Sequence, residues 1–380
     1  MIKAKVLQDL IAVPRTDFPI TSAYFSVGNT AATRKLHLVE LKKLIRYKQD
    51  TTYFKQLSEE EQKSVLADFE KMMQWYDTGL DTSKFAASIT YSSSASGIWK
   101  TIDLKRPLTN ALVVQPLPYI RPLVGLFSRH RNYALVLVDR AKARLLESRL
   151  GVYKEHFYIE DNSPEAVKVG GYRGREERKV ERNIRQGVKQ HYKEVAQRVF
   201  DLNKDFKFNW IIIGGRKETI SEFRKYLHDY VASKVQATVE VEPSAALNYV
   251  LEKVGQTEER AREDFEGKLL AEIEGKKQKL QAVDGIEASL QMIRNSLVQT
   301  LVIHEDFKRK GVFSRNSDHI GLTLADNGVG DSERLERTND VIEHLIHLAL
   351  TQNTDVEFVR SAMQQYGGIA AILRYPIAKK

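Results

Sequence analysis

The sequence predicts an α/β protein of three domains, and three observations lead to that expectation. With 380 residues, the chain exceeds the length over which a single hydrophobic core keeps growing. The stretch FNWIIIGGRKETISEFRKYL runs from a buried-strand pattern through two glycines into a helical pattern, as in an α/β domain. The C-terminal third alternates helical and strand patterns. We therefore expect an N-terminal α/β domain at residues 1–130, a central α/β sheet domain at 131–255 and a small C-terminal α/β sandwich at 256–380.

Residues 1–130 show strand patterns on both sides of a helical region. The run SAYFSV is typical of a strand, and a charged helical stretch extends from about Thr33 to Trp75, where apolar residues recur at helical spacing. Two further strands are predicted in FAASITYSSS and GIWKTIDL. The prolines of RPLTNALVVQPLPYIRPLVGLF then argue against one continuous helix. They indicate a connector or an extended strand followed by a helix start, with the first domain boundary just after it.

The central domain is predicted to open with a β-hairpin. NYALVLVDRAKARLLES contains an apolar run, a turn at Asp139 and Arg140, and a second alternating run. Farther on, Gly214 and Gly215 end the buried strand of FNWIIIGG. A glycine pair at that place could bind phosphate, or it could allow a tight exit from the strand. The absence of a spaced lysine or a third glycine favours the tight exit.

A charged helical region from Glu252 to Gln281 is expected to link or straddle the central and C-terminal domains. It carries only a thin apolar stripe, formed by Phe265, Leu269, Leu270 and Ile273. Beyond it, helical and strand patterns alternate through GIEASLQMI, SLVQTLVIHEDF, DVIEHLIHLALTQNTDVEFV and GGIAAILRYP. This alternation predicts the α/β sandwich of the third domain.

Composition and charge indicate an ordinary globular protein with a polyanionic partner. Hydrophobic residues make up 42% of the chain and charged residues 29%, which excludes disordered and fibrous classes. The formal net charge of +9 favours a polyanion, because clustered Lys and Arg release counterions from phosphates; the alternative is charge that serves only solubility. The absence of cysteine excludes disulfides, thiolate zinc sites and cysteine nucleophiles, and it fits a reducing cytoplasm.

Neither a targeting segment nor a familiar catalytic motif occurs in the sequence. The N-terminus MIKAKVLQDLIAVPRTDFP lacks the apolar core of a signal peptide, and no later run approaches ~20 apolar residues. We therefore expect a cytoplasmic protein without a membrane partner. Gly-x-Ser-x-Gly, Walker and His-Glu-x-x-His motifs are absent, so serine hydrolases, nucleotide hydrolases and metalloproteases have no support. His344 and His347 have no third ligand at a suitable spacing, which favours a structural or surface role, and we predict neither metal nor cofactor.

The segment VGGYRGREERKVERNIRQGVKQHYKEVAQRVF predicts a glycine loop that runs into a long helix with one basic face. Between Gly171 and Phe200, nine Lys or Arg residues stand against four Glu residues, so the segment holds five of the nine surplus charges of the chain. Spacings of three and four residues place six cations in one narrow arc: Arg175, Arg178, Arg182, Arg185, Lys189 and Lys193. Five apolar residues lie on the opposite side and should pack on the sheet: Val180, Ile184, Val188, Val195 and Val199.

Two interpretations of this basic helix are open. Glutamates in its first turn suit the positive helix end and can pair with Arg or Lys four residues on, which would make a solvent-facing helix with many ion pairs. A one-sided ridge of this length instead matches a nucleic-acid backbone. We favour the second interpretation and take the six cations of the arc as the RNA-binding residues.

The order of these segments resembles the archaeo-eukaryotic peptide chain release factor and Pelota family, and especially its divergent bacterial branch. The resemblance covers roughly Tyr133 to the C-terminus, whereas residues 1–130 match only loosely, through GIWKTIDL and PYIRPL. It is most specific in FVRSAMQQYGGIAAILRYP, which is similar to the family's closing strand and its glycine-helix-strand ending.

The resemblance implies a role for the glycine loop. In family members that release peptides, the corresponding loop carries Gly-Gly-Gln, which positions a water against the peptidyl-tRNA ester. The candidate residues here are Gly170, Gly171, Arg173, Gly174 and Arg175, with no glutamine among them. The nearest glutamine, Gln186, falls inside the predicted helix, so positioning of water would have to come from RNA or a backbone amide. The sequence therefore leaves both a hydrolase and a non-enzymatic factor open.

Two further departures from the family pattern narrow the implied function. The N-terminal part has neither the Asn-Ile-Lys-Ser loop nor the Cys-containing motif of the family's stop-codon readers, so stop-codon reading is not expected. The segment RKGVFSRNSDHIG lies where relatives often carry zinc-binding cysteines, and Asp318 and His319 alone are poor evidence for a metal.

We therefore expect a translation factor that binds the ribosome and contacts tRNA or rRNA through the loop and the basic helix, with a role in ribosome rescue, stress or hibernation. Some relatives are delivered by a translational GTPase, which makes such a GTPase a candidate partner. Two alternatives stay open. One is a peptidyl-tRNA hydrolase that acts through the Gly170–Gly174 loop, and the other is a protein-interaction scaffold without an RNA partner.

Overall fold

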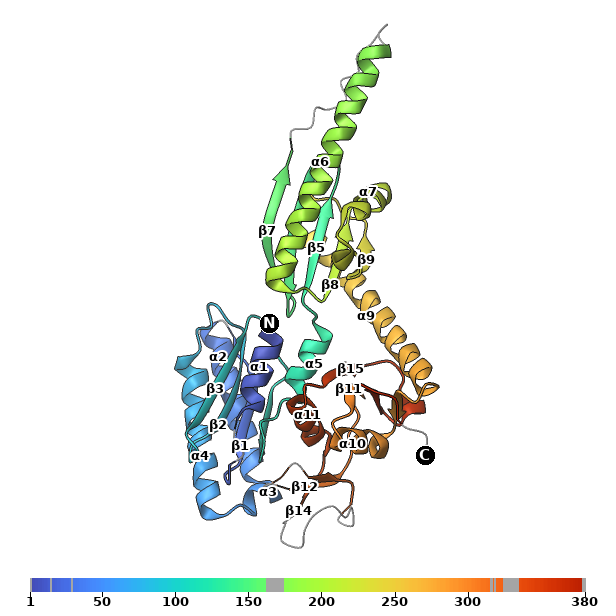
Figure 1. Ribbon diagram of the computed structural model, residues 1–380. Helices are drawn as coiled ribbons and strands as arrows, with labels where there is room; N and C mark the ends of the chain where they lie inside the picture. The colour runs from blue at the N-terminus through green and yellow to red at the C-terminus, as the bar shows by residue number, and fades with distance from the viewer. Residues whose placement is uncertain are drawn as a thin grey trace. The chain divides into compact units, whose positions relative to one another are not determined.

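The computed structural model describes residues 2–13, 16–28, 30–161, 174–314, 317, 319–323 and 335–377, and it shows a mixed α/β chain (Figure 1). The described residues form four β-sheets, so the α/β class expected from the sequence is confirmed. The chain divides into two units. We call residues 129–269 the central unit, and residues 2–128 together with 270–380 the split unit.

The central unit is built on a five-stranded mixed sheet with the strand order β7-β6-β5-β8-β9. Its strands are β5 (Tyr133–Val138), β6 (Lys142–Arg149), β7 (Val152–Glu160), β8 (Trp210–Gly214) and β9 (Val235–Val239). The predicted hairpin is confirmed as the antiparallel pair β5-β6. Its turn is closed by Asp139, whose carboxylate accepts hydrogen bonds from the main-chain N–H groups of Ala141 (2.8 Å) and Lys142 (2.6 Å). β5, β8 and β9 are parallel neighbours.

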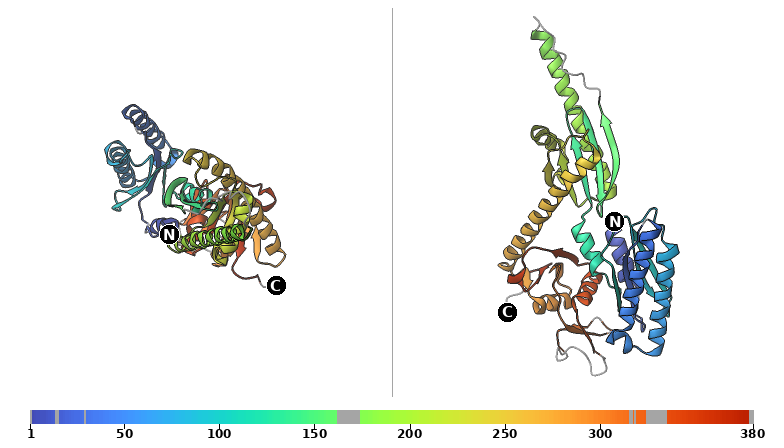
Figure 2. Two further views of the ribbon diagram at one scale, coloured as in Figure 1. Left: turned by 90° about the horizontal axis from the view of Figure 1, so that it is seen from above. Right: turned by 180° about the vertical axis from the view of Figure 1, so that it is seen from behind.

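Helices cover both faces of this sheet (Figures 1 and 2). α6 (Gly174–Phe206) packs on one face, with the shorter helices α7 (Lys217–Phe223) and α8 (Asp229–Ala232) beside it, and α9 (Leu247–Lys277) packs on the other. Alternating side chains of β5 pack under α6 and under α9, because successive residues of a strand point to opposite faces of the sheet. Val136 lies in the cluster under α6, whereas Leu135 and Leu137 lie in the cluster under α9.

The glycine pair at the end of β8 is explained by close packing. A Cβ atom on Gly215 would stand 2.4 Å from the carbonyl oxygen of Val138, and the φ angle of Gly215 is +150°. A Cβ atom on Gly214 would stand 2.3 Å from the side chain of Leu137. The neighbouring strand therefore excludes any side chain at these two positions, in agreement with the tight strand exit inferred from the sequence.

The N-terminal part of the split unit is a four-stranded antiparallel sheet with the order β3-β2-β1-β4. The strands are β1 (Ile20–Ser26), β2 (Ala87–Ser93), β3 (Ile98–Leu104) and β4 (Ala111–Gln115). The helices are α1 (Ile2–Ile11), α2 (Ala31–Gln49), α3 (Thr52–Lys55), α4 (Glu59–Gln74) and α5 (Arg121–Arg129), with a π-helical turn at Trp75–Gly79. The predicted helical stretch is thus divided, because the side chains of Thr51 and Ser58 each cap a new helix. α1 was not predicted.

The C-terminal part of the split unit alternates helix and strand as expected. Its main sheet has the order β10-β16-β11-β15, and a three-stranded sheet has the order β13-β12-β14. The strands are β10 (Ala282–Asp284), β11 (Val298–His304), β12 (Gly311–Ser314), β13 (Ile320–Gly321), β14 (Leu335–Thr338), β15 (Asp355–Val359) and β16 (Ile369–Leu373). The helices are α10 (Ile286–Arg294) and α11 (Ile342–Thr351). Among the helices that the structure describes, none combines the length and the apolar character that a membrane crossing needs.

Candidate nucleic-acid interface

The buried face of α6 fixes the helix to the sheet of the central unit. Val188, Val195 and Val199 are buried in the core cluster, and Ile184 packs against it half-buried, which confirms the predicted apolar side. The side chain of Val180 lies outside the described residues. Two further core residues were not predicted, Tyr192 and His191, although the first follows Val188 by four residues and the second precedes Val195 by four. Helical spacing alone could have found both.

The opposite face of α6 is a row of exposed cations. Arg182, Arg185, Lys189 and Lys193 are all exposed, and within the described part of the chain none of them has a carboxylate at ion-pair distance. We call these four residues the basic ridge. Outside the ridge the same helix does contain an ion pair, Arg198 with Glu194 at 2.7 Å. The predicted basic face therefore exists over these four residues, and its charge is not neutralised by internal pairs.

The remaining predicted residues of this site are only partly described. Gly174 is the first residue of α6, and Arg175 and Arg178 belong to that helix, but their side chains lie outside the described residues. Gly170, Gly171 and Arg173 lie outside them altogether. Gln186 is exposed on α6, twelve residues after Gly174, which is about 18 Å along a helix axis. That glutamine therefore lies well away from the start of the helix.

A partly buried hydrogen bond fixes the point at which the chain leaves β7. Nδ1 of His191 lies 2.5 Å from Oδ2 of Asp161, and the main-chain N–H of Asp161 donates to the carbonyl of Ala141 at 2.7 Å. His191 is 2% exposed, whereas the Asp161 side chain is 40% exposed, so the contact lies at the edge of the core. From His191, α6 continues toward its N-terminus for 17 residues, or about 25 Å. The ridge residues Arg182 and Arg185 belong to this extension.

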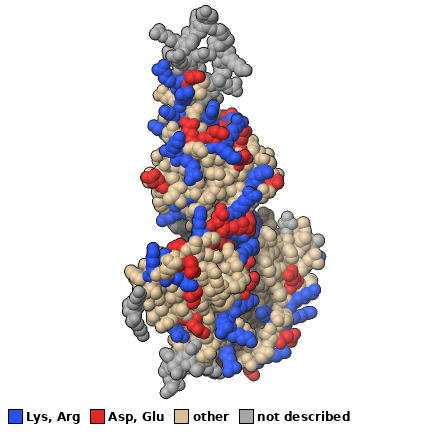
Figure 3. All heavy atoms as spheres, turned by 90° about the vertical axis from the view of Figure 1, so that its right-hand side faces the viewer, with Lys and Arg blue, Asp and Glu red and all other residues tan. Residues whose placement is uncertain are grey.

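The charge distribution is visible on the surface. On the face drawn in Figure 3, Lys and Arg side chains are numerous over the central unit, and Asp and Glu side chains lie among them. Guanidinium and ammonium groups stay charged at neutral pH and offer several N–H donors, which suits phosphate oxygens. A row of such groups on a helix whose other face is buried can bind an extended polyanion.

The two histidines of α11 have packing roles. His347 is buried, and its Nε2 donates to the carbonyl oxygen of Pro118 at 2.7 Å. His344 is also buried and stacks on Phe313, with ring centroids 3.9 Å apart. No group of three His, Cys, Asp or Glu residues suited to a metal occurs among the residues that the structure describes. Asp318 lies outside them, and His319 lines a small cavity together with both histidines.

Two family models match successive parts of the chain. Residues 118–259 match the model of bacterial archaeo-eukaryotic release factor family 10, and residues 266–377 match that of eRF1 domain 3. The peptide chain release factor subunit 1 of Methanobrevibacter smithii is 24% identical over 292 residues, which are 68% of this chain and 69% of the relative.

Solved structures of similar proteins extend over much of the chain. An archaeal translation termination factor is 14% identical, with 98% of this chain and 97% of that chain covered and a TM-score of 0.26. Pelota of Archaeoglobus fulgidus is 15% identical, with 78% and 82% covered and a TM-score of 0.32. A translation termination-like factor of S. cerevisiae involved in RNA quality control is 12% identical, with 79% and 82% covered and a TM-score of 0.40.

The two family matches and the archaeal relative indicate a translation factor-like protein of the release factor and Pelota type. More particularly, the central part matches family 10 of the bacterial archaeo-eukaryotic release factors and the C-terminal part matches eRF1 domain 3, so the chain is similar to the divergent bacterial branch of these proteins. The resemblance seen in the sequence is confirmed.

Proposed function

We propose that this protein binds the ribosome or its tRNA through the basic ridge and acts in ribosome rescue or stress, without reading stop codons. One observation carries the proposal: four exposed cations, none with a carboxylate at ion-pair distance among the described residues, stand in a row on a helix whose opposite face is buried in the core. The family matches support it, because release factors act in translation. On the same basis we propose a cytoplasmic site of action and a translational GTPase as partner, and we retain the three domains 1–130, 131–255 and 256–380 as a proposal.

Within the part of α6 whose side chains are described, the lack of ion pairs along the basic ridge favours RNA over simple solvation. In a helix that only faces solvent, Glu residues one turn away would neutralise Lys and Arg in part. Arg182, Arg185, Lys189 and Lys193 instead keep their full charge, with about one cation in each helical turn. Because the buried face holds α6 in place, the protein loses little conformational entropy when the phosphate backbone of an RNA binds.

Co-sedimentation with ribosomes across a salt series tests the proposal. The variant Arg182→Glu/Arg185→Glu/Lys189→Glu should lose at least ten-fold in affinity at 0.15 M salt, because three phosphate contacts become repulsive. The matched control Lys253→Glu/Arg260→Glu/Lys268→Glu changes the net charge equally, on α9 of the same unit, and should bind as the wild type does. Equal co-sedimentation of both variants would overturn the assignment of the ridge.

A peptide-release assay on stalled ribosome complexes distinguishes a non-enzymatic ribosome factor from a peptidyl-tRNA hydrolase and from a scaffold. Ribosome binding without release of labelled peptide is the expected result for a factor without the glutamine of the glycine loop. Binding with release would support the peptidyl-tRNA hydrolase. A wild-type protein that binds no ribosomal state would contradict the proposal and support the scaffold.

A further inference from the structure

The basic ridge is followed along α6 by an aromatic group on the same side of the helix. Phe200 and Lys204 come seven and eleven residues after Lys193, which is two and three turns farther along one helix face. The Nζ atom of Lys204 lies 4.2 Å from the centroid of the Phe200 ring, and Lys204 also pairs with Asp201 at 3.1 Å. The ridge therefore ends in an aromatic ring with a cation on it.

His228 extends this aromatic surface outward. Its ring stacks on Phe200 with a centroid distance of 4.5 Å and an interplanar angle of 25°, and His228 itself is exposed. Its Nδ1 accepts a hydrogen bond from the main-chain N–H of Tyr230 at 3.2 Å, which fixes the ring and leaves the proton on Nε2. The imidazole is thus held in one orientation at the surface.

Tyr230 adds a second exposed ring. It is 54% exposed, and the Nζ of Lys234 lies 4.3 Å from its centroid. Lys234 is held in place because it donates to Oδ1 of Asn203 at 3.1 Å and to the carbonyl of Phe208 at 2.8 Å. A fixed cation therefore covers part of Tyr230, while much of the tyrosine side chain is open to solvent.

The exposed rings at this place stand among cations and two carboxylates, Asp229 and Asp201, the second of which pairs with Lys204. Leu227 and Val231, which flank His228 and Tyr230 in sequence, are both buried. Arg224 and Lys225 are exposed close by in the sequence. An aliphatic surface would indicate a protein partner, whereas aromatic rings among cations are what proteins use to stack the unpaired bases of single-stranded nucleic acids.

We propose that His228 and Tyr230, with Lys204 and Lys234, form a stacking surface for an unpaired nucleobase of the same RNA whose phosphates the basic ridge binds. The inference rests on the proposed function, and it adds the class of RNA: single-stranded, or a duplex with a base out of the stack. A base must be unstacked to reach these rings, so a fully paired duplex gains nothing from them.

Fluorescence anisotropy with two RNA probes tests the stacking surface. The probes are a labelled 12-nucleotide single strand of mixed sequence and the same strand in a blunt duplex. Tyr230→Ala and His228→Ala should each weaken single-strand binding about tenfold and leave duplex binding within twofold. Tyr230→Phe keeps the ring and should bind as wild type does. The matched control Tyr249→Ala, a tyrosine 48% exposed on α9 with Lys253 5.7 Å from its ring centroid, should change neither affinity.

The outcomes separate this inference from the proposed function. Equal losses on both probes, or no loss on the single strand, would overturn the stacking surface while leaving the ridge intact. Wild-type protein that binds neither probe would overturn it too, and ribosome co-sedimentation would then still test the ridge by itself. Weaker ribosome binding by Tyr230→Ala with unchanged single-strand affinity would assign the surface to a protein contact. Thermal unfolding followed by circular dichroism checks that each variant is folded.

Discussion

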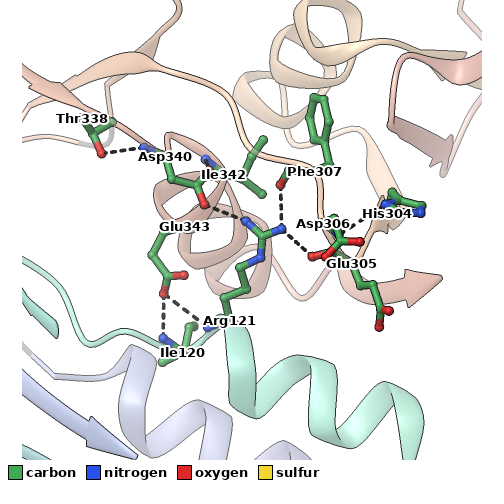
Figure 4. A network of polar contacts seen from close by, with 10 residues as sticks. All are labelled: Ile120, Arg121, His304, Glu305, Asp306, Phe307, Thr338, Asp340, Ile342 and Glu343. Carbon is green, nitrogen blue, oxygen red and sulfur yellow. Dashed lines mark hydrogen bonds and ion pairs between the residues drawn. The ribbon is translucent and has the colours of Figure 1, made fainter. Parts of the chain in front are cut away.

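The carboxyl group of Glu343, on α11, lies at the N-terminal end of α5, where its Oε1 accepts a hydrogen bond from the main-chain N–H of Ile120 at 2.6 Å (Figure 4). The next residue, Arg121, donates from its guanidinium to Oδ2 of Asp340 at 2.6 Å and to the carbonyl oxygen of Phe307 at 2.6 Å. These contacts tie α5 to the C-terminal part of the split unit. Burial raises the pKa of Glu343 to about 8, against the opposing effect of the Ile120 N–H.

Glu343→Gln should therefore reduce the pH dependence of stability. The folded pKa of about 8 lies above the ordinary 4.5, so the protonated carboxyl stabilises the fold fully below pH 4.5, and that contribution is lost as the pH rises through 8. The free energy of unfolding of the wild type should fall relative to the variant by roughly 3–5 kcal/mol between pH 5 and 9. Urea unfolding at a series of pH values measures this, with the exposed Glu287→Gln as control. Parallel profiles for wild type and Glu343→Gln would contradict the prediction.

The contact between His191 and Asp161 should contribute more to the free energy of unfolding than an exposed ion pair does. Asp161→Ala leaves a buried ring nitrogen without its partner and should cost about 1–3 kcal/mol of stability in the central unit. His191→Ala should cost at least as much, and the double variant less than the sum, with a coupling of about 1 kcal/mol. Native-state hydrogen exchange of the β8 amides measures each value. Asp201→Ala breaks the exposed pair with Lys204 and should cost less stability than Asp161→Ala, because solvent screens an exposed pair. Strict additivity would show that the contact contributes nothing.

Two glycine substitutions in the central unit should change its stability in opposite directions. Gly215→Ala places a Cβ atom 2.4 Å from the carbonyl oxygen of Val138, so the backbone must shift, and we expect a loss of more than about 1 kcal/mol. Gly267→Ala lies in α9 with open space around the new atom and should stabilise the unit by up to about 1 kcal/mol. Melting temperatures of the two variants give the comparison. A Gly215→Ala protein as stable as the wild type would show that the strands are not packed this closely.

The salt dependence of RNA binding should reflect the number of phosphates that the basic ridge contacts. If Arg182, Arg185, Lys189 and Lys193 each neutralise one phosphate of a single strand, the plot of log K against log salt concentration should have a slope near about −3. Lys189→Ala should reduce the magnitude of that slope by about 0.7. Arg198→Ala removes a cation of the same helix that is already paired with Glu194, and it should leave the slope unchanged. Identical slopes for the two variants would argue against phosphate contacts by the ridge.

Much of the fold could be predicted because it depends on local periodicity. The spacing of three and four residues in α6 separates Lys189 and Lys193 from Val188 and Val195 whatever the rest of the chain does. The hairpin at Asp139 and the strand that ends at Gly214 likewise follow from patterns within about ten residues. The division of the N-terminal helical stretch was missed because caps such as Ser58 interrupt a helix without a change in hydrophobic spacing.

The sequence by itself determined that α6 has one basic and one apolar face, that helices and strands alternate in the C-terminal part, and which family the chain resembles. Only the tertiary structure decided which side chains meet across long separations. Glu343 and Ile120 are 223 residues apart, and His228 reaches Phe200 from a different element. The reason is physical: periodicity sets which side of an element faces the core, whereas the partner of a buried carboxyl or an aromatic ring depends on how whole elements pack.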